Sequence, residues 1–120
     1  MINQRPHKQL TLWKKALEMV RILYDTTRTF PREEEFGLKA QIRRAAVSVP
    51  SNIAEGLTRK SRNDRLRFLN IADGSLSEID TQLEIARMLG MMNDEHFGAA
   101  ESSLVTVEQL LGGLRRRIMN

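Results

Sequence analysis

Apolar residues recur every three or four positions in four long segments of the chain, at residues 10–30, 38–57, 61–90 and 93–118. This spacing puts the apolar side chains on one face of a helix, so each segment predicts an amphipathic helix. We find no alternation typical of a strand and no internal repeat. Four such helices joined by short links pack most simply as an up-down-up-down antiparallel four-helix bundle, so we predict an all-α fold.

The predicted helices are bounded by residues that start or stop helices. Ser61 with Asp64 resembles a capping box at the start of the third helix, and Asn93 is suited to cap the fourth. Gly90 closes the third helix, which is the longest. The length of the chain fits one domain, residues 1–120, because cores divide only in longer chains.

Each predicted helix has a main apolar face. In the first helix we assign this face to Trp13, Ala16, Leu17, Val20, Leu23, Tyr24 and Thr27. Second stripes run along the first and third helices, through Leu12, Met19, Ile22, Phe68, Ile71, Ser75, Gln82, Ile85 and Leu89. A bundle that stands alone needs one face per helix, so the surplus favours a subunit interface, with Phe68, Ile71 and Ile85 buried between subunits. The alternative is a monomer with a broad core.

The stretch QIRRAAVSVPSNIAEG lies inside the second predicted helix but contains Pro50. Proline removes a backbone donor and clashes with the preceding turn, at a cost of about 3 kcal/mol, so the helix must kink or restart there. The continuous apolar spacing favours one helix kinked at Pro50, with Asn52 and Glu55 bonding freed backbone groups or neighbouring side chains. The alternative is a helix that restarts with Ser48 as its cap.

Small residues of the second and third predicted helices are expected to face one another. Antiparallel pairing sets Ser48 roughly opposite Ala72 and Asp73, where the two backbones can approach closely. Gly74 and Ser75 then lie where the two backbones come close. This explains why a glycine stands inside a helix although it lowers the stability of the helix by about 1 kcal/mol.

Arg43 and Arg44 are expected to have structural roles. The same pairing sets Arg44 roughly opposite residues 76–78, so Glu78 is the expected partner of its guanidinium group. Because arginines in such a position hold two helices together, we predict that they stabilise the fold rather than bind a ligand.

At these residues the chain resembles a known family. The string QIRRAAVSVPSNIAEG, the later strings RKS and RFLNIADGSLSEI, and the earlier LWKKA and FP look like four-helix-bundle proteins from open reading frames in 23S rRNA intervening sequences. The match spans residues 10 to 90, and the last helix matches only in its pattern. The resemblance implies a homopentameric ring. A related protein is the nucleic-acid-binding accessory subunit of diversity-generating retroelements, so a reverse transcriptase is a candidate protein partner.

The composition limits the chemistry. The chain has no cysteine, which excludes disulfides, thiolate metal sites and cysteine nucleophiles. His7 and His96 are isolated, and neither stands three residues after a glutamate, as a di-iron bundle requires. There is no glycine-rich phosphate loop and no apolar run long enough for a membrane span. We therefore expect a cytoplasmic protein that is not an enzyme, with no cofactor, no metal and no membrane contact.

The charges are unevenly distributed along the chain, whose net charge is +4. In an up-down bundle, residues 1–18, 55–67 and 108–120 share one end. They hold twelve basic and four acidic side chains, a net charge of +8, and leave −4 for the rest. From this end we select as phosphate-binding candidates Arg59, Lys60, Arg62, Arg65, Arg115, Arg116 and Arg117. The alternative is that the arginine run complements a helix dipole and the other residues form a solvated surface.

The leading hypothesis is a non-enzymatic, oligomeric nucleic-acid-binding accessory module, with RNA favoured over DNA. Sequence-specific base recognition is not expected, because no stacking aromatic residues accompany the charges. The alternative is an oligomeric protein-interaction scaffold that binds no nucleic acid and has no need of a basic end.

Overall fold

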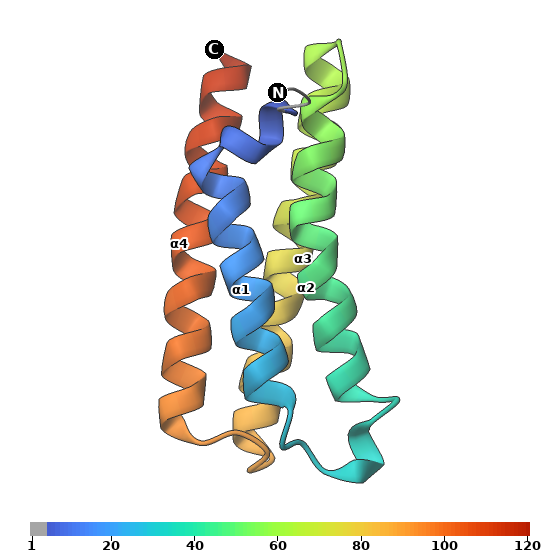
Figure 1. The fold of residues 1–120 in the computed structure, drawn as a ribbon, viewed down its shortest axis with the longest axis vertical. Helices are drawn as coiled ribbons and strands as arrows, with labels where there is room; N and C mark the ends of the chain where they lie inside the picture. Colours follow the sequence, from blue (N-terminus) through green and yellow to red (C-terminus); the bar gives the residue numbers. More distant parts are fainter. Residues whose placement is uncertain (1–4) are drawn as a thin grey trace.

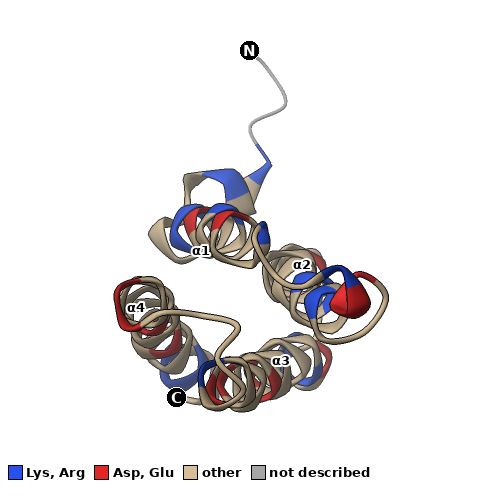
Figure 2. Ribbon diagram, turned by 90° about the horizontal axis from the view of Figure 1, so that it is seen from below, with Lys and Arg blue, Asp and Glu red and all other residues tan. Residues whose placement is uncertain are grey.

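Four long helices dominate the computed structural model, which describes residues 5–120. They are α1 (Thr11–Thr27), α2 (Leu38–Leu57), α3 (Arg62–Met88) and α4 (Asp94–Met119). Two short 3₁₀ turns, η1 (Pro6–Gln9) and η2 (Arg32–Glu34), precede α1 and α2. Successive helices run in opposite directions along the long axis (Figure 1) and surround one core in the order α1, α2, α3, α4 (Figure 2). The predicted all-α four-helix bundle is confirmed.

Side chains cap the starts of two helices, as predicted. The Ser61 hydroxyl accepts a hydrogen bond from the backbone N–H of Asp64 at 3.1 Å, and the Asn93 side chain accepts one from His96 at 2.7 Å. Each bond satisfies a first-turn donor that has no partner within its helix. Gly90 follows α3 with φ +76°, a backbone conformation that glycine adopts without steric cost.

The core contains most of the regularly spaced apolar residues of α2, α3 and α4, among them Ile42, Leu76 and Leu104. Its largest fully buried side chains are Met19, Leu23, Ile42, Val49, Ile53, Leu69, Leu76, Ile79, Leu83, Leu104, Val107 and Leu111. Partly buried side chains such as Trp13 and Ile118 pack against its margin. Among residues 5–120, no helix has an apolar stretch long enough to cross a membrane.

The predicted main face of α1 is only partly correct, because Ala16, Leu23 and Thr27 are buried as predicted but other members are not. Leu12 and Met19, assigned to a second stripe, are buried, whereas Leu17 and Tyr24 of the assigned face are 41% and 37% exposed. Both stripes keep helical spacing, so the spacing alone does not distinguish them. Helix α1 packs against both α2 and α4, and the face between these two contacts is the buried one.

Helix α2 continues through Pro50 as one helix of 20 residues, so the alternative of a restart at Ser48 is wrong. A kink at Pro50 stays a prediction. The Asn52 amide donates hydrogen bonds to the carbonyl oxygen of Ser48 at 2.8 Å and to its hydroxyl at 3.0 Å. The carbonyl that lacks a donor because of Pro50 is that of Ala46. Asn52 therefore reinforces a neighbouring turn, and Glu55 pairs with Arg59 one turn later.

A hydroxyl pair joins α2 to α3. The oxygens of Ser48 and Ser75 lie 2.9 Å apart, and Ser75 is only 8% exposed. The expected contact between small residues of these helices is therefore present. Its position differs slightly from the prediction, because Ser48 meets Ser75 rather than Ala72 and Asp73.

The backbone of α2 comes closest to α3 at Gly56, and not opposite Gly74 as predicted. A Cβ atom on Gly56 would stand 3.1 Å from the Cβ of Phe68 and 3.3 Å from the carbonyl oxygen of Arg65. Gly74 is exposed, and a Cβ there would meet no neighbouring atom within 4 Å. The prediction is wrong because α3 turns Gly74 away from α2 and presents the adjacent Ser75 instead.

Replacing Gly56 by valine is expected to lower the free energy of unfolding by about 2 kcal/mol, because the added side chain meets the backbone of α3. Urea unfolding followed by circular dichroism measures this change. Gly74→Ala is the matched control and is expected to raise stability by about 0.5 to 1 kcal/mol, since it fills open space within a helix. If the Gly56→Val chain is as stable as the wild type, α3 can move away from α2 and make room for the added side chain.

Candidate nucleic-acid interface

The start of α1, the link between α2 and α3, and the end of α4 lie at one end of the bundle (Figure 1). An open pocket of about 530 Å³ lies at this end, between the start of α3 and the end of α4. We call it the basic pocket, and its lining residues are Lys60, Arg62, Arg65, Leu114, Arg117, Ile118 and Asn120. Four of the seven predicted phosphate-binding residues therefore meet in one place.

Two of these four side chains are held by hydrogen bonds to backbone carbonyls. Arg62 donates to the carbonyl oxygen of Met119 at 3.3 Å, which ties the start of α3 to the end of α4. Arg65 donates through Nε to the carbonyl oxygen of Arg59 at 2.8 Å. A guanidinium group has five N–H donors, so each arginine keeps donors for a ligand while one bond orients it.

The cations of the basic pocket lack acidic side-chain partners among residues 5–120. Within the described part of the chain, Lys60, Arg62, Arg65 and Arg117 form no ion pair with an aspartate or glutamate. The start of α3 adds the partial positive charge of a helix N-terminus, whereas the last turn of α4 adds a partial negative charge that Arg117 complements. The pocket thus carries a surplus of positive charge.

The other three predicted residues lie outside the pocket lining. Arg59 pairs with Glu55 on the preceding turn, and Arg115 pairs with Asp73 of α3 at 3.5 Å. Arg116 is exposed on α4. The predicted set therefore divides into four cations that share a pocket, two that are neutralised, and one that stands apart.

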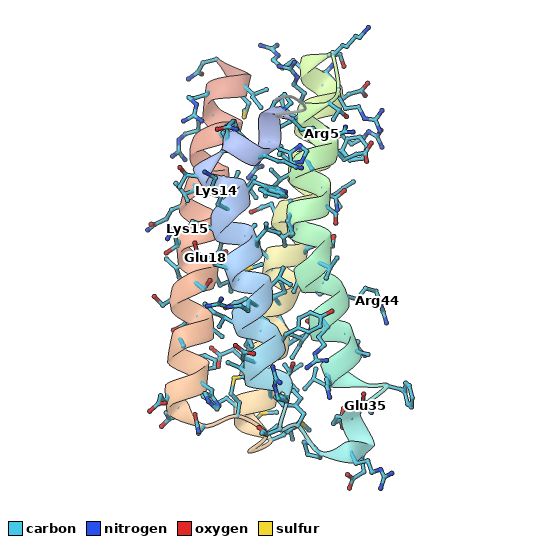
Figure 3. All side chains as sticks on the ribbon, viewed as in Figure 1. Arg5, Lys14, Lys15, Glu18, Glu35 and Arg44 are labelled. Carbon is cyan, nitrogen blue, oxygen red and sulfur yellow. The ribbon has the colours of Figure 1, made fainter. Side chains whose placement is uncertain are left out.

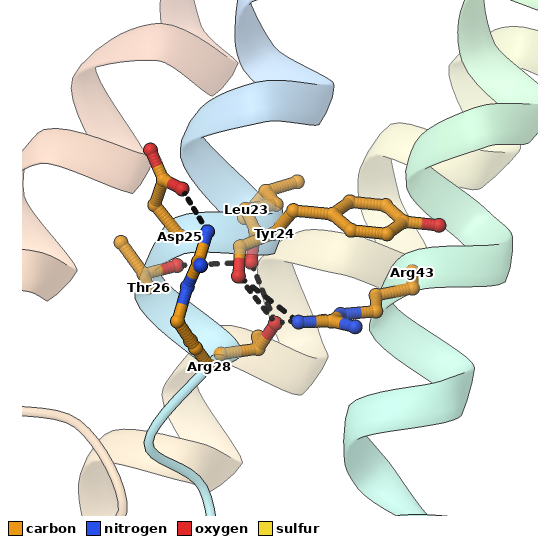
Figure 4. Close-up of polar contacts among 7 residues, drawn as sticks. Leu23, Tyr24, Asp25, Thr26, Arg28 and Arg43 are labelled. Atoms are coloured by element: carbon orange, nitrogen blue, oxygen red, sulfur yellow. Dashed lines mark hydrogen bonds and ion pairs between the residues drawn. The ribbon is translucent and has the colours of Figure 1, made fainter.

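Arg43 and Arg44 have different environments. Arg43 donates hydrogen bonds to the hydroxyl of Thr27 and the carbonyl oxygen of Tyr24, both at 3.0 Å, and its guanidinium lies 4.3 Å from the Tyr24 ring centroid (Figure 4). Its partner is therefore α1. Arg44 is exposed and points away from the bundle (Figure 3), and among the described residues it has no ion pair with Glu78, so that predicted contact is wrong. Adjacent residues lie about 100° apart around a helix, so both cannot face the same neighbour.

Replacing Arg43 by glutamine is expected to lower the free energy of unfolding by about 1 to 2 kcal/mol, because two hydrogen bonds and a cation–π contact to α1 are lost. Arg44→Gln is the control and is expected to stay within about 0.5 kcal/mol of the wild type. Thermal unfolding of the two variants side by side measures the difference. Equal losses of stability in the two variants would contradict a structural role for Arg43 that Arg44 does not share.

The predicted interface residues on α3 lie at the surface of the single chain. Ile71 and Ile85 are 44% and 36% exposed. Phe68 is half-buried, and the guanidinium groups of Arg59 and Arg67 lie 4.8 and 4.7 Å from its ring centroid. A subunit interface at this stripe stays a prediction.

An apolar groove of about 320 Å³ between η1, α1 and α2 was not predicted. It is lined by His7, Trp13, Leu17, Val20, Val47, Pro50, Ser51 and Ala54. The presence of two apolar stripes on α1 was the signal for it, but we assigned the stripe with Trp13, Leu17 and Val20 to the core.

The side of the bundle formed by α3 and α4 carries acidic residues. Partial burial raises the pKa of the Glu108 carboxyl, and the neighbouring carboxylates of Asp80 and Asp73 raise it further. These carboxylates disfavour a phosphate at this part of α3 and α4, whereas the basic pocket at the end of the same two helices carries positive charge. Over residues 5–120, no group of three or more acidic or histidine side chains is placed to hold a metal ion.

Comparison with known proteins identifies relatives of this fold. The sequence model of the 23S rRNA-intervening sequence protein family matches residues 8–113. Among solved structures, a protein of unknown function from the S23 ribosomal protein family of Bacteroides thetaiotaomicron is 28% identical, with a TM-score of 0.77. That match covers 88% of this chain and 98% of the other. A search of curated proteins gave no match. Because the family match includes most of the bundle, the chain belongs to the family of 23S rRNA-intervening sequence proteins.

Proposed function

We propose that the chain is a non-enzymatic, oligomeric nucleic-acid-binding accessory module that works in the cytoplasm, with RNA as its favoured ligand. The observation that carries this proposal is the convergence of Lys60, Arg62, Arg65 and Arg117 in one pocket without carboxylate partners among the residues described. Cations that neutralise phosphates release condensed counterions, and this release drives most sequence-independent binding.

The pocket lining also predicts how the nucleic acid is recognised. None of its seven residues is aromatic, so it offers no stacking platform for successive bases. Contacts to phosphates fix the position of a strand but carry no base information. Binding is therefore expected to depend strongly on salt and weakly on sequence.

Fluorescence anisotropy with labelled mixed-sequence oligonucleotides, measured over a range of salt concentrations, tests the proposal. Each phosphate neutralised changes the slope of log K against log salt by about −0.7 on single strands and about −0.9 on duplex DNA. Four pocket cations thus predict a slope of about −2.8 for single-stranded RNA. If the protein has no affinity for RNA or DNA at low salt, the proposal fails.

A second candidate function is an oligomeric protein-interaction scaffold. The apolar groove supports it, since Leu17 and Val47 in the groove are 41% and 43% exposed. Assembly as a pentamer and a reverse transcriptase as partner rest on the family resemblance. The two functions depend on different surfaces: nucleic-acid binding needs the basic pocket, whereas a scaffold needs the groove.

A further inference from the structure

We propose that the basic pocket holds a whole nucleotide unit, with its phosphate and nucleoside together, rather than a bare phosphate. This inference rests on the proposed nucleic-acid binding and names the group that the pocket recognises, a nucleoside monophosphate, free or within a strand. The observation behind it is that the lining combines four cations with two aliphatic side chains, Leu114 and Ile118.

The cationic part of the pocket suits the phosphate. Arg62 and Arg65 are each oriented by a bond to a backbone carbonyl, at 3.3 and 2.8 Å, and keep further N–H donors free of these bonds. Lys60 and Arg117 line the same pocket from the link before α3 and from the last turn of α4. A phosphate that binds here exchanges its water shell for charge-assisted hydrogen bonds, which are stronger than hydrogen bonds between neutral groups.

The aliphatic part of the pocket suits the nucleoside. Ile118 is half-buried against the core and supplies most of the apolar contact, whereas Leu114, 8% exposed, adds only its edge. An inorganic phosphate has no apolar surface to remove from water, and this part of the lining contributes nothing to its binding. A base or ribose has apolar surface and gains from that contact.

The size and charge of the pocket agree with a ligand of this kind. Its volume of about 530 Å³ falls in the range of small-molecule sites and exceeds what one phosphate needs. No aspartate or glutamate side chain is among the lining residues, so the four cations outweigh the partial negative charge at the end of α4. Asn120 adds an amide that can both donate and accept hydrogen bonds.

Isothermal titration calorimetry of the full chain at low salt, with AMP and with inorganic phosphate, tests this inference. AMP is expected to bind at least about tenfold more tightly than phosphate, a difference of about 1.4 kcal/mol. Ile118→Asn is expected to remove the advantage of AMP and leave phosphate binding unchanged. Arg117→Gln is expected to weaken both ligands, and Arg44→Gln, an exposed cation outside the pocket, neither.

A measurement on the wild-type protein tests the inference even if one of these variants fails to fold. Saturation transfer from the aliphatic methyl groups of the protein to the base protons of AMP is expected, and it fades in Ile118→Asn. Competition separates the two sources of the ligand. AMP that displaces labelled RNA shows that strands use the pocket, and AMP that binds without displacement assigns the pocket to free nucleotides.

Equal affinity for AMP and phosphate would overturn the inference, as would AMP binding that Arg117→Gln does not weaken. Either result leaves RNA binding through backbone phosphates in place. A wild-type protein that binds AMP but no RNA or DNA would instead overturn the proposed function. The two proposals can therefore fail separately.

Discussion

A chain in which Lys60, Arg62, Arg65 and Arg117 are all replaced by glutamine is expected to bind single-stranded RNA about four-thousandfold more weakly than the wild type at about 50 mM salt. At this salt concentration, each lost phosphate contact removes nearly one order of magnitude from the binding constant. The slope of log K against log salt is expected to flatten by about 2.8 in the same variant. Anisotropy titrations with several unrelated sequences measure both changes, and all sequences should weaken alike because backbone contacts carry no base information.

A second charge-reduced chain serves as the control for this result. It carries glutamine at four exposed cations outside the basic pocket, Lys14, Arg21, Arg32 and Arg44. Both variants lose four positive charges, so they differ only in where the charge is lost. If the control loses as much affinity as the pocket variant, binding follows the net charge of the protein and not the basic pocket.

The second large effect is expected in the oligomeric state. Replacing Ile71 by glutamate is expected to dissociate the assembly, because a carboxylate buried between subunits has no partner and costs several kcal/mol. Helicity should be retained, since the buried intrachain face of α3 with Leu69, Ala72 and Leu76 is unchanged. Light scattering coupled to size exclusion gives the mass of each variant, to be compared with 13.8 kDa for one chain.

The matched control for Ile71 lies on another helix. Val105 of α4 is exposed to a similar extent, 42% against 44%, but is outside the predicted interface. Val105→Glu should therefore leave the assembly intact. A wild-type chain with a monomer mass across micromolar concentrations would contradict the prediction altogether.

The main buried stripes of α2, α3 and α4 were predictable from their spacing, although Ser75 and Gln82 of the second stripe on α3 are buried as well. In α1 two apolar stripes compete, and the choice depends on where α2 and α4 lie, which the spacing within one helix does not contain. The prediction for Gly74 failed for a related reason. A glycine in a helix indicates a close approach, but the rotation of the helix decides whether Gly56 or Gly74 meets a neighbour.

The basic pocket was only partly predictable. Clustering of charge at one end followed from the chain order of an up-down bundle, whereas the division of the seven candidates depended on their ion pairs. The pair of Glu55 with Arg59 has the four-residue spacing that joins side chains on one helix, so the sequence carried a signal for it. The pair of Arg115 with Asp73 joins two helices and required the structure.

The hydroxyl pair of Ser48 and Ser75 also limits how α2 can slide along α3. Apolar stripes with a repeat of three and four residues tolerate a shift by one turn, about 5.4 Å, because similar side chains then meet. After such a shift the buried Ser75 hydroxyl would lose its partner, at a cost of about 1 to 3 kcal/mol. Gly56 would at the same time leave its place beside Phe68, and a residue with a side chain would enter it. Two small, unremarkable contacts thus select one axial alignment from several that the hydrophobic surface alone would accept.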